Sequence, residues 1–257
     1  MRNVITIARR EIMSFFISPV AYFVITGFLL LAGYFFFNFL GIYNEVLQRY
    51  SMMPYRDSMN MPNLNQWVVE GFFQTLLIIL VFMIPFLTMR TIAEEKKRGT
   101  FELLVTSPLS VKEIVMGKYL GVAAVIALMM ISVTAFPLLL YVFGNPEFWP
   151  IMSGLLALLL CSLAFASIGM AVSSFTENQI VAGISAMVVL LLLYVIHAPA
   201  ESLGGTAAEV LNYLSPTMQV RDLIRGVISA KSLTYFFSLI IFGLFLSERA
   251  LEAYRWR

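Results

Sequence analysis

The chain has 257 residues, of which 60% are hydrophobic and 12% charged, and its mean hydropathy is +0.86. Soluble domains carry about 25% charged residues, so this composition leaves too little polar surface to face water and argues against a soluble enzyme. The net charge of +2 is small, and we expect no nucleic-acid partner. The single cysteine, Cys161, lies in an apolar run and is expected to be a small packing residue.

The apolar runs predict an all-α, polytopic membrane protein that forms one domain, residues 1–257, with six transmembrane helices. A helix needs roughly 20 apolar residues to cross a hydrocarbon core of about 30 Å. The predicted spans are 20–40, 72–89, 120–143, 151–172, 180–196 and 233–246. With a cytoplasmic N terminus, 12 of the 17 Lys and Arg residues lie on the cytoplasmic side, as positive charges do in membrane proteins. Both termini are then cytoplasmic.

Residues 3–17 have the periodicity of an amphipathic helix that lies in the membrane interface. Arg9 and Arg10 lie on its polar face, and Pro19 is expected to turn the chain into the first span. The apolar face comprises Val4, Ile5, Ala8, Ile12, Phe15 and Phe16. Glu11 lies at the edge of this face, where we expect a solvated carboxylate; a contact with a cytoplasmic partner is the alternative.

The densest polar segment is 90–118, between the second and third spans. Gly99 is expected to stop one helix, and a short second helix with an apolar stripe of Phe101 and Leu104 follows. Ser110 and Glu113 form a capping box that starts the third span. A positive-inside anchor would need only the basic residues, whereas a short helix with an exposed apolar stripe fits a groove in a partner. A docking element is therefore the better interpretation.

The second cytoplasmic loop, 173–178, is short, and Thr176 with Gln179 is expected to form the capping box of the fifth span. This loop is either a second partner contact or only a tight turn. Small residues four positions apart flank it and favour close packing of helices within the chain, with a dimer interface as the alternative. These pairs are Ser162 with Ala166, Ser167 with Ala171, Gly169 with Ser173, and Ala182 with Ala186.

Residues 198–231 are predicted to form a helical hairpin on the outer side, too short to span the membrane twice. It starts after Gly204 and continues from Pro216 in a second helix. Arg221, Asp222 and Arg225 on this second helix are expected to pair with one another; binding of an anionic lipid or sugar group is the alternative.

The segment 90–118 resembles a run in the permease subunits of ABC-2-type transporters, especially the group associated with bacterial gliding motility. The residues that carry the resemblance there are Glu95, Gly99, Thr100, Glu102, Leu103, Leu104, Ser107 and Pro108. Arg10-Glu11 with Ser18-Pro19, the run 173–179, and Leu214-Ser215-Pro216 resemble further parts of the family, so that the likeness covers the whole chain.

The resemblance implies a half-transporter of the bacterial inner membrane. Two such chains, identical or related, would form the pathway, and the outer hairpin would seal its outer mouth. Separate cytoplasmic ATPases, carrying the ATP and Mg, would dock on the loop and drive alternating access. The implied docking residues are Glu95, Gly99, Thr100, Phe101, Glu102, Leu103, Leu104, Ser107 and Pro108.

The sequence also shows which functional motifs this chain lacks. It has no Gly-x-x-x-x-Gly-Lys-Ser/Thr run to hold phosphates, so ATP hydrolysis is expected on another chain. We expect this chain to have no cofactor, metal or catalytic site. The predicted spans contain no Asp, Glu, Lys or Arg, which disfavours an ion-coupled carrier and suits a lipid-like or amphiphilic cargo. A non-transporting subunit that passes ATPase motion to a periplasmic partner stays open as an alternative.

Overall fold

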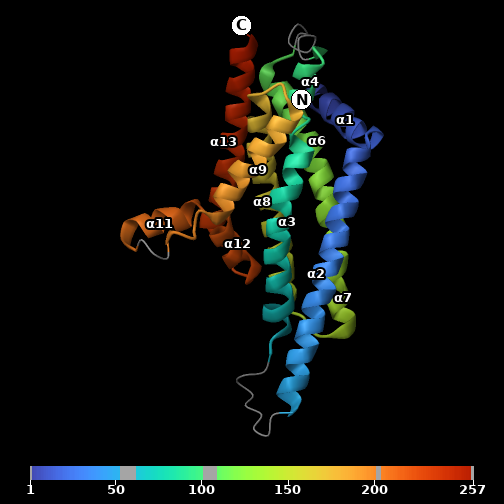
Figure 1. Ribbon diagram of the computed structural model, residues 1–257, viewed down its shortest axis with the longest axis vertical. Helices are drawn as coiled ribbons and strands as arrows, with labels where there is room; N and C mark the ends of the chain where they lie inside the picture. Colours follow the sequence, from blue (N-terminus) through green and yellow to red (C-terminus); the bar gives the residue numbers. More distant parts are fainter. Residues whose placement is uncertain (1, 53–61, 101–108, 201–203, 256–257) are drawn as a thin grey trace.

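A computed structural model describes residues 2–52, 62–100, 109–200 and 204–255, and within these ranges the chain is helical without a strand. Figure 1 shows the helices as a long upright bundle. The elements are α1 (Arg2–Ile17), α2 (Pro19–Met52), the π-helix η2 (Asn65–Glu70), α3 (Gly71–Thr88), α4 (Ala93–Lys97), α6 (Val111–Val133), α7 (Ala135–Phe143), α8 (Phe148–Ser174), α9 (Gln179–Val195), α11 (Gly205–Leu214), α12 (Pro216–Ile224) and α13 (Ala230–Arg255).

Five helical stretches of the described chain are long and apolar enough to cross a membrane. They are Pro19–Met52, Asn65–Lys97, Val111–Val142, Phe148–Ser174 and Ala230–Arg255. The remaining predicted span, 180–196, coincides with α9, an apolar helix of 17 residues. The all-α, multi-span prediction is confirmed, and the count of six stays a prediction that depends on α9.

The predicted spans differ in extent from the helices that the chain forms; the last, for example, is predicted at 233–246, whereas α13 covers Ala230–Arg255. The first was expected to end at residue 40, but α2 continues to Met52 because helix-compatible polar residues simply extend it beyond the apolar run. The third is interrupted at Thr134, where α6 gives way to α7. Pro137 lies in the first turn of α7 and lacks the N–H that would continue the helical ladder to Val133.

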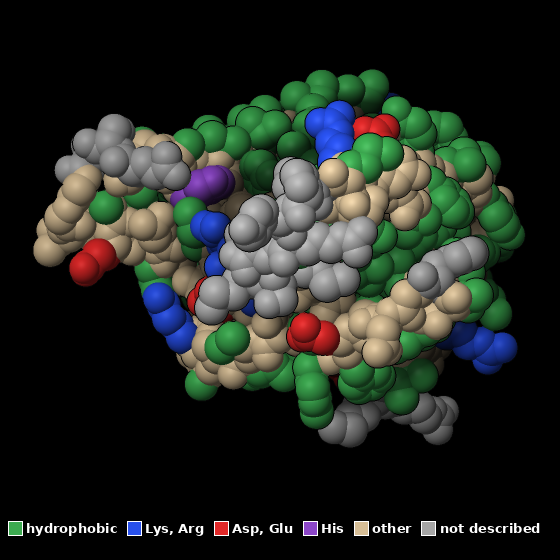
Figure 2. Space-filling view, turned by 90° about the horizontal axis from the view of Figure 1, so that it is seen from below, with side chains coloured by type: hydrophobic (Ala, Val, Ile, Leu, Met, Phe, Trp, Pro, Cys, Tyr) green, Lys and Arg blue, Asp and Glu red, His purple; other side chains and the backbone are tan. Residues whose placement is uncertain are grey.

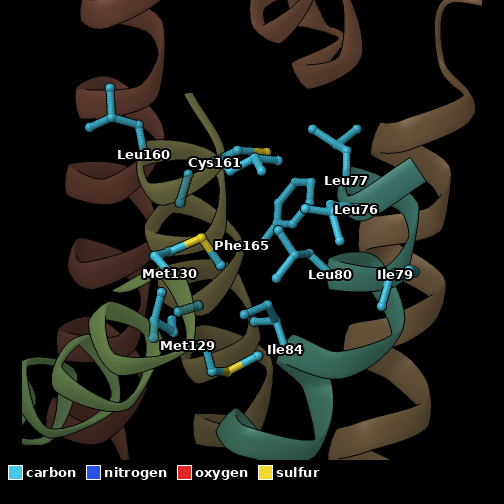
Figure 3. Packing of buried hydrophobic residues seen from close by; sticks show 14 of the residues in the cluster. Leu76, Leu77, Ile79, Leu80, Ile84, Met129, Met130, Leu160, Cys161 and Phe165 are labelled. Carbon is cyan, nitrogen blue, oxygen red and sulfur yellow. The ribbon is translucent and has the colours of Figure 1, made fainter. Parts of the chain in front are cut away.

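The core of the bundle forms around α8, the most enclosed of the long helices. In its apolar segment 67% of the residues are buried, against 28% in α2 and in α13. Figure 3 shows most of the labelled side chains of α3, α6 and α8 pointing toward one another in this core, whereas Ile79 points to the other side of α3. The labelled residues are Leu76, Leu77, Ile79, Leu80, Ile84, Met129, Met130, Leu160, Cys161 and Phe165. Cys161 is fully buried among them, as its apolar context predicted.

Small residues of α8 bring its neighbours close. A Cβ added at Gly169 would lie 2.3 Å from the hydroxyl oxygen of Thr88 on α3, so only glycine fits there. A Cβ at Gly243 of α13 would lie 2.5 Å from the hydroxyl of Ser167 on α8. Packing within one chain therefore accounts for the small residues of α8, as the spacing of the pairs favoured.

The two ends of the bundle have different characters. Both termini lie at one end, together with α1 and α4, which we call the polar end (Figure 1). Seen from the opposite end, hydrophobic side chains cover broad parts of the flanks, and charged side chains are sparse (Figure 2). Helix α11 projects sideways from the bundle (Figure 1), and none of its residues is buried.

Candidate functional site

Helix α1 crosses the polar end and packs along α6. Two glycines of α6 let it approach: a Cβ at Gly117 would lie 2.6 Å from the Cβ of Ile7, and one at Gly121 would lie 2.6 Å from the Cβ of Glu11. The predicted helix and the turn at Pro19 are confirmed. Of the predicted apolar face, Ala8 and Phe15 are buried against the rest of the chain and Ile5 is 67% exposed; the contact of this face with the membrane interface stays a prediction.

A buried lysine joins α1, α6 and the segment after α3. The ammonium of Lys118 on α6 lies 3.2 Å from a carboxylate oxygen of Glu11 on α1 and 2.8 Å from one of Glu95 on α4. It also donates a hydrogen bond of 2.7 Å to the carbonyl of Thr91. The three donors of the ammonium thus meet three acceptors, although the side chain is only 2% exposed. We call these four residues the charged cluster.

The charged cluster corrects the prediction for Glu11, which is not a solvated carboxylate. Its side chain is 13% exposed and bound to Lys118. Part of the apolar face of α1, Ala8 and Phe15, is buried in the protein instead of facing the membrane. The missing information was the partner, since the lysine that neutralises Glu11 lies 107 positions away in the chain.

The residues 89–100, which we call the elbow, connect α3 to the segment 101–108. The hydroxyl of Ser173, near the end of α8, donates to the carbonyl of Met89 and accepts from the N–H of Ala93, both at 3.1 Å. Lys96 donates to the carbonyl of Ser174 and lies 4.3 Å from the centre of the Tyr254 ring on α13. The elbow is therefore held by α8 and α13 as well as by the charged cluster.

The elbow also contacts α1 directly. The guanidinium of Arg90 lies 5.4 Å from the centre of the Phe15 ring and 3.4 Å from the hydroxyl of Ser14. Glu94 pairs with Arg90 at 3.3 Å and with Arg98 one turn further on. Four long helices, α1, α6, α8 and α13, thus hold this short polar segment.

The elbow carries the first three residues of the predicted docking motif. Glu95 belongs to the charged cluster, and one of its carboxylate oxygens is buried without a hydrogen-bond partner in the described chain. Gly99 has a φ of +68°, a value that suits glycine, and α4 ends just before it, as predicted. The hydroxyl of Thr100 donates to the carbonyl of Glu95. The other motif residues, Phe101, Glu102, Leu103, Leu104, Ser107 and Pro108, lie outside the described residues.

The two capping boxes predicted at this end have different outcomes. That of Ser110 and Glu113 is present and starts α6. That of Thr176 and Gln179 is wrong, because α9 is capped by Asn178, whose side chain accepts from the N–H groups of Ile180 and Val181. Thr176 instead accepts a hydrogen bond from the N–H of Asn178 within the turn.

At the outer hairpin, the two predicted helices and the start at Pro216 are confirmed. The expected pairing among Arg221, Asp222 and Arg225 is wrong: within the described chain no ion pair joins them. Arg225 reaches Glu70 before α3 at 3.1 Å instead, because α12 packs toward the bundle and brings this side chain to another helix.

The sequence marks Lys118 and Lys96 only as positive charges of the cytoplasmic side, and Ser173 as a small residue and the start of the run 173–179 that resembles the family. In the structure, contacts of all three side chains hold the elbow in place. One signal pointed to the cluster: Glu11 on an apolar helix face needs a cation, and Lys118 is a lysine of the predicted cytoplasmic side directly next to an apolar span.

These features define a polytopic helical membrane protein with a short, firmly held polar segment at one end of its bundle. A family profile described as ABC-2 family transporter protein matches residues 44–247. The chain therefore belongs to the ABC-2 transporter family and is a multi-pass membrane permease subunit of that kind. No protein in a search of curated sequences matches the chain.

Proposed function

We propose that the chain is the membrane half of an ABC transporter whose separate ATPase docks on the segment that follows the elbow. The observation that carries this proposal is the way in which the elbow is fastened. A push on residues 101–108 would act through Gly99 on a segment bound to α1, α6, α8 and α13.

Such fastening suits a part that transmits motion. Charge-assisted hydrogen bonds with little exposure keep their geometry better than solvated ones. Since the charged cluster joins α4 to α1 and α6, these three helices would move as one body. Ser173 adds α8, the central helix, to this body. Closure of two ATPases would then swing whole helices, which is what alternating access requires.

In the same proposal the polar end faces the cytoplasm of a bacterium, α9 is the sixth span, and two chains form the pathway. The shared end for both termini agrees with an even number of spans. The apolar character of the spans favours a lipid-like or amphiphilic cargo. The likeness to permeases associated with gliding motility remains a prediction from the sequence.

Docking is tested by replacing Phe101 and Leu104 with Asp. We expect the variant to insert into the membrane at the wild-type level and to lose the co-purifying ATPase, because charges replace the apolar stripe that would fill its groove. Replacement of Phe82 and Phe86, both exposed on α3, by Leu is the matched control and should retain the ATPase. Retention of the ATPase by the Asp variant would disprove docking at this segment.

Orientation and span count are tested with single cysteines in a Cys161→Ala background. Gln66 and Lys97 are both exposed and lie near the two ends of the stretch that includes α3. Cysteines at these positions should react with a membrane-impermeant reagent from opposite sides, position 97 from the cytoplasm. Reaction of both from the same side would contradict the proposed topology.

A further inference from the structure

A groove of about 910 Å³ lies at the polar end between α1, the first turn of α2 and the elbow, and it reaches the start of α9. Four arginines line it: Arg9 and Arg10 from α1, and Arg90 and Arg98 from the elbow. Among the described residues, Glu94 is the one acidic residue in its lining. The groove therefore carries an excess of positive charge that the proposed transport cycle does not use.

The arginines of the groove are unequally engaged. Glu94 is shared between Arg90 and Arg98. Arg9 and Arg10 are exposed, and neither has an ion-pair partner among the described residues. Two guanidinium groups on adjacent residues of one helix, open to a groove, are well suited to the oxygens of a phosphate group, which guanidinium binds through paired hydrogen bonds.

The other side of the groove is apolar. Met13 is 49% exposed and Ile17 is 86% exposed, and both line the groove just before α2 begins at Pro19. Tyr22 and Phe23 on the first turns of α2 are also exposed, and exposed aromatic residues at the start of a span are typical of the membrane interface. The groove thus lies where headgroups meet acyl chains.

We propose that this groove binds the phosphate of an anionic phospholipid, with Arg9 and Arg10 on the phosphate and Met13 and Ile17 against its acyl chains. An anionic lipid supplies both the charge for the arginines and the apolar surface for the exposed side chains. The acidic surface of a soluble protein supplies only the charge and would leave Ile17 in water. Groups of basic residues beside a membrane span bind anionic lipids in general. Here the elbow, with Arg90 and Arg98, forms the second side of the groove.

The test is native mass spectrometry of the detergent-purified protein after addition of phosphatidylglycerol or phosphatidylcholine, with excess inorganic phosphate as a third arm. We expect wild type to retain phosphatidylglycerol in preference to phosphatidylcholine, and phosphate not to displace it. The variant Arg9→Gln with Arg10→Gln should weaken retention roughly tenfold or more, since each basic residue near a membrane contributes on the order of a fivefold factor.

Arg249→Gln with Arg255→Gln is the matched control, because it removes the same charge from exposed positions of α13 at the same end, outside the groove. It should retain the lipid as wild type does. If the Arg9 and Arg10 variant does not fold, the single changes Arg9→Gln and Arg10→Gln replace it, each with an expected loss of roughly fivefold.

Three results would overturn the proposal. Unchanged retention of phosphatidylglycerol in a folded groove variant would show that the arginines do not bind it. Displacement by inorganic phosphate would make the groove a site for a free anion. Loss of the ATPase with normal lipid retention in the Arg9 and Arg10 variant would assign the groove to a protein partner.

Discussion

Each end of the bundle has an ion pair between distant segments, but the two are built differently. At the polar end, Lys118 is 2% exposed and meets two carboxylates and a carbonyl. At the opposite end, Arg225 is 48% exposed and meets Glu70 alone among charged groups of the described chain. A buried charge without its partner is costly, whereas an exposed pair is weak and screened. We infer that the polar end is fixed as one body, and that α12 of the outer hairpin is held mainly by apolar packing of Val220, Leu223 and Ile224.

The largest effect on stability is expected for Lys118→Met at the polar end. The change removes the ammonium and leaves Glu11 and Glu95 facing each other with little water. We expect a loss of about 3–5 kcal/mol in unfolding free energy, measured by denaturant unfolding in detergent. Lys112→Met is the control, because Lys112 is 74% exposed and 3.6 Å from Glu248; it should cost less than about 1 kcal/mol.

A triple variant sharpens the interpretation. Adding Glu11→Gln and Glu95→Gln to Lys118→Met removes the unpaired charges, and we expect most of the lost stability to return. If the triple variant is as unstable as Lys118→Met, the cost came from lost packing of the lysine stem and not from unpaired carboxylates.

The close contact of α1 and α6 should show a smaller effect. In Gly121→Ala the new Cβ would collide with Glu11, since it would lie 2.6 Å from the Cβ of that residue. We expect a loss of about 1–3 kcal/mol in unfolding free energy, as for other overpacked sites, measured in the same assay. Gly41→Ala in α2 has open space around the new Cβ and should be neutral or slightly stabilising. Equal effects of the two changes would mean that α1 does not dock on α6.

The outer pair should show the smallest effect. Arg225→Gln removes the cation that pairs with Glu70, whose side chain is 16% exposed and keeps a hydrogen bond from Gln74, and we expect a loss of at most about 1 kcal/mol. The same denaturant experiment checks this value, with addition of salt as an independent probe. A loss as large as that of Lys118→Met would contradict the contrast between the two ends.

The features that the sequence predicted well are those decided by neighbouring residues. Gly99 ends a helix, Ser110 with Glu113 starts one, and Pro216 occupies a first helical turn, each for a reason contained in a few residues. The helices followed from long apolar runs, although where α2 would end did not, because polar residues can continue a helix into water.

The features that could not be predicted join residues far apart. Glu11 and Lys118 are brought together by the docking of α1 on α6, and Arg225 meets Glu70 across 155 positions. Residues close in sequence suggested ion pairs that the fold does not form, such as Asp222 with Arg225. At residues 176–179 two local patterns competed, and Asn178 formed the cap because its side chain stands directly before the first helical residue.

The most direct test of the account is purification of the tagged chain from its native membrane in mild detergent, followed by mass spectrometry of the proteins that accompany it. The account predicts a stoichiometric soluble subunit that carries a Gly-x-x-x-x-Gly-Lys-Ser/Thr loop. An intact, folded chain that purifies without such a subunit would contradict the proposed ATPase partner and, with it, the transmission role of the elbow.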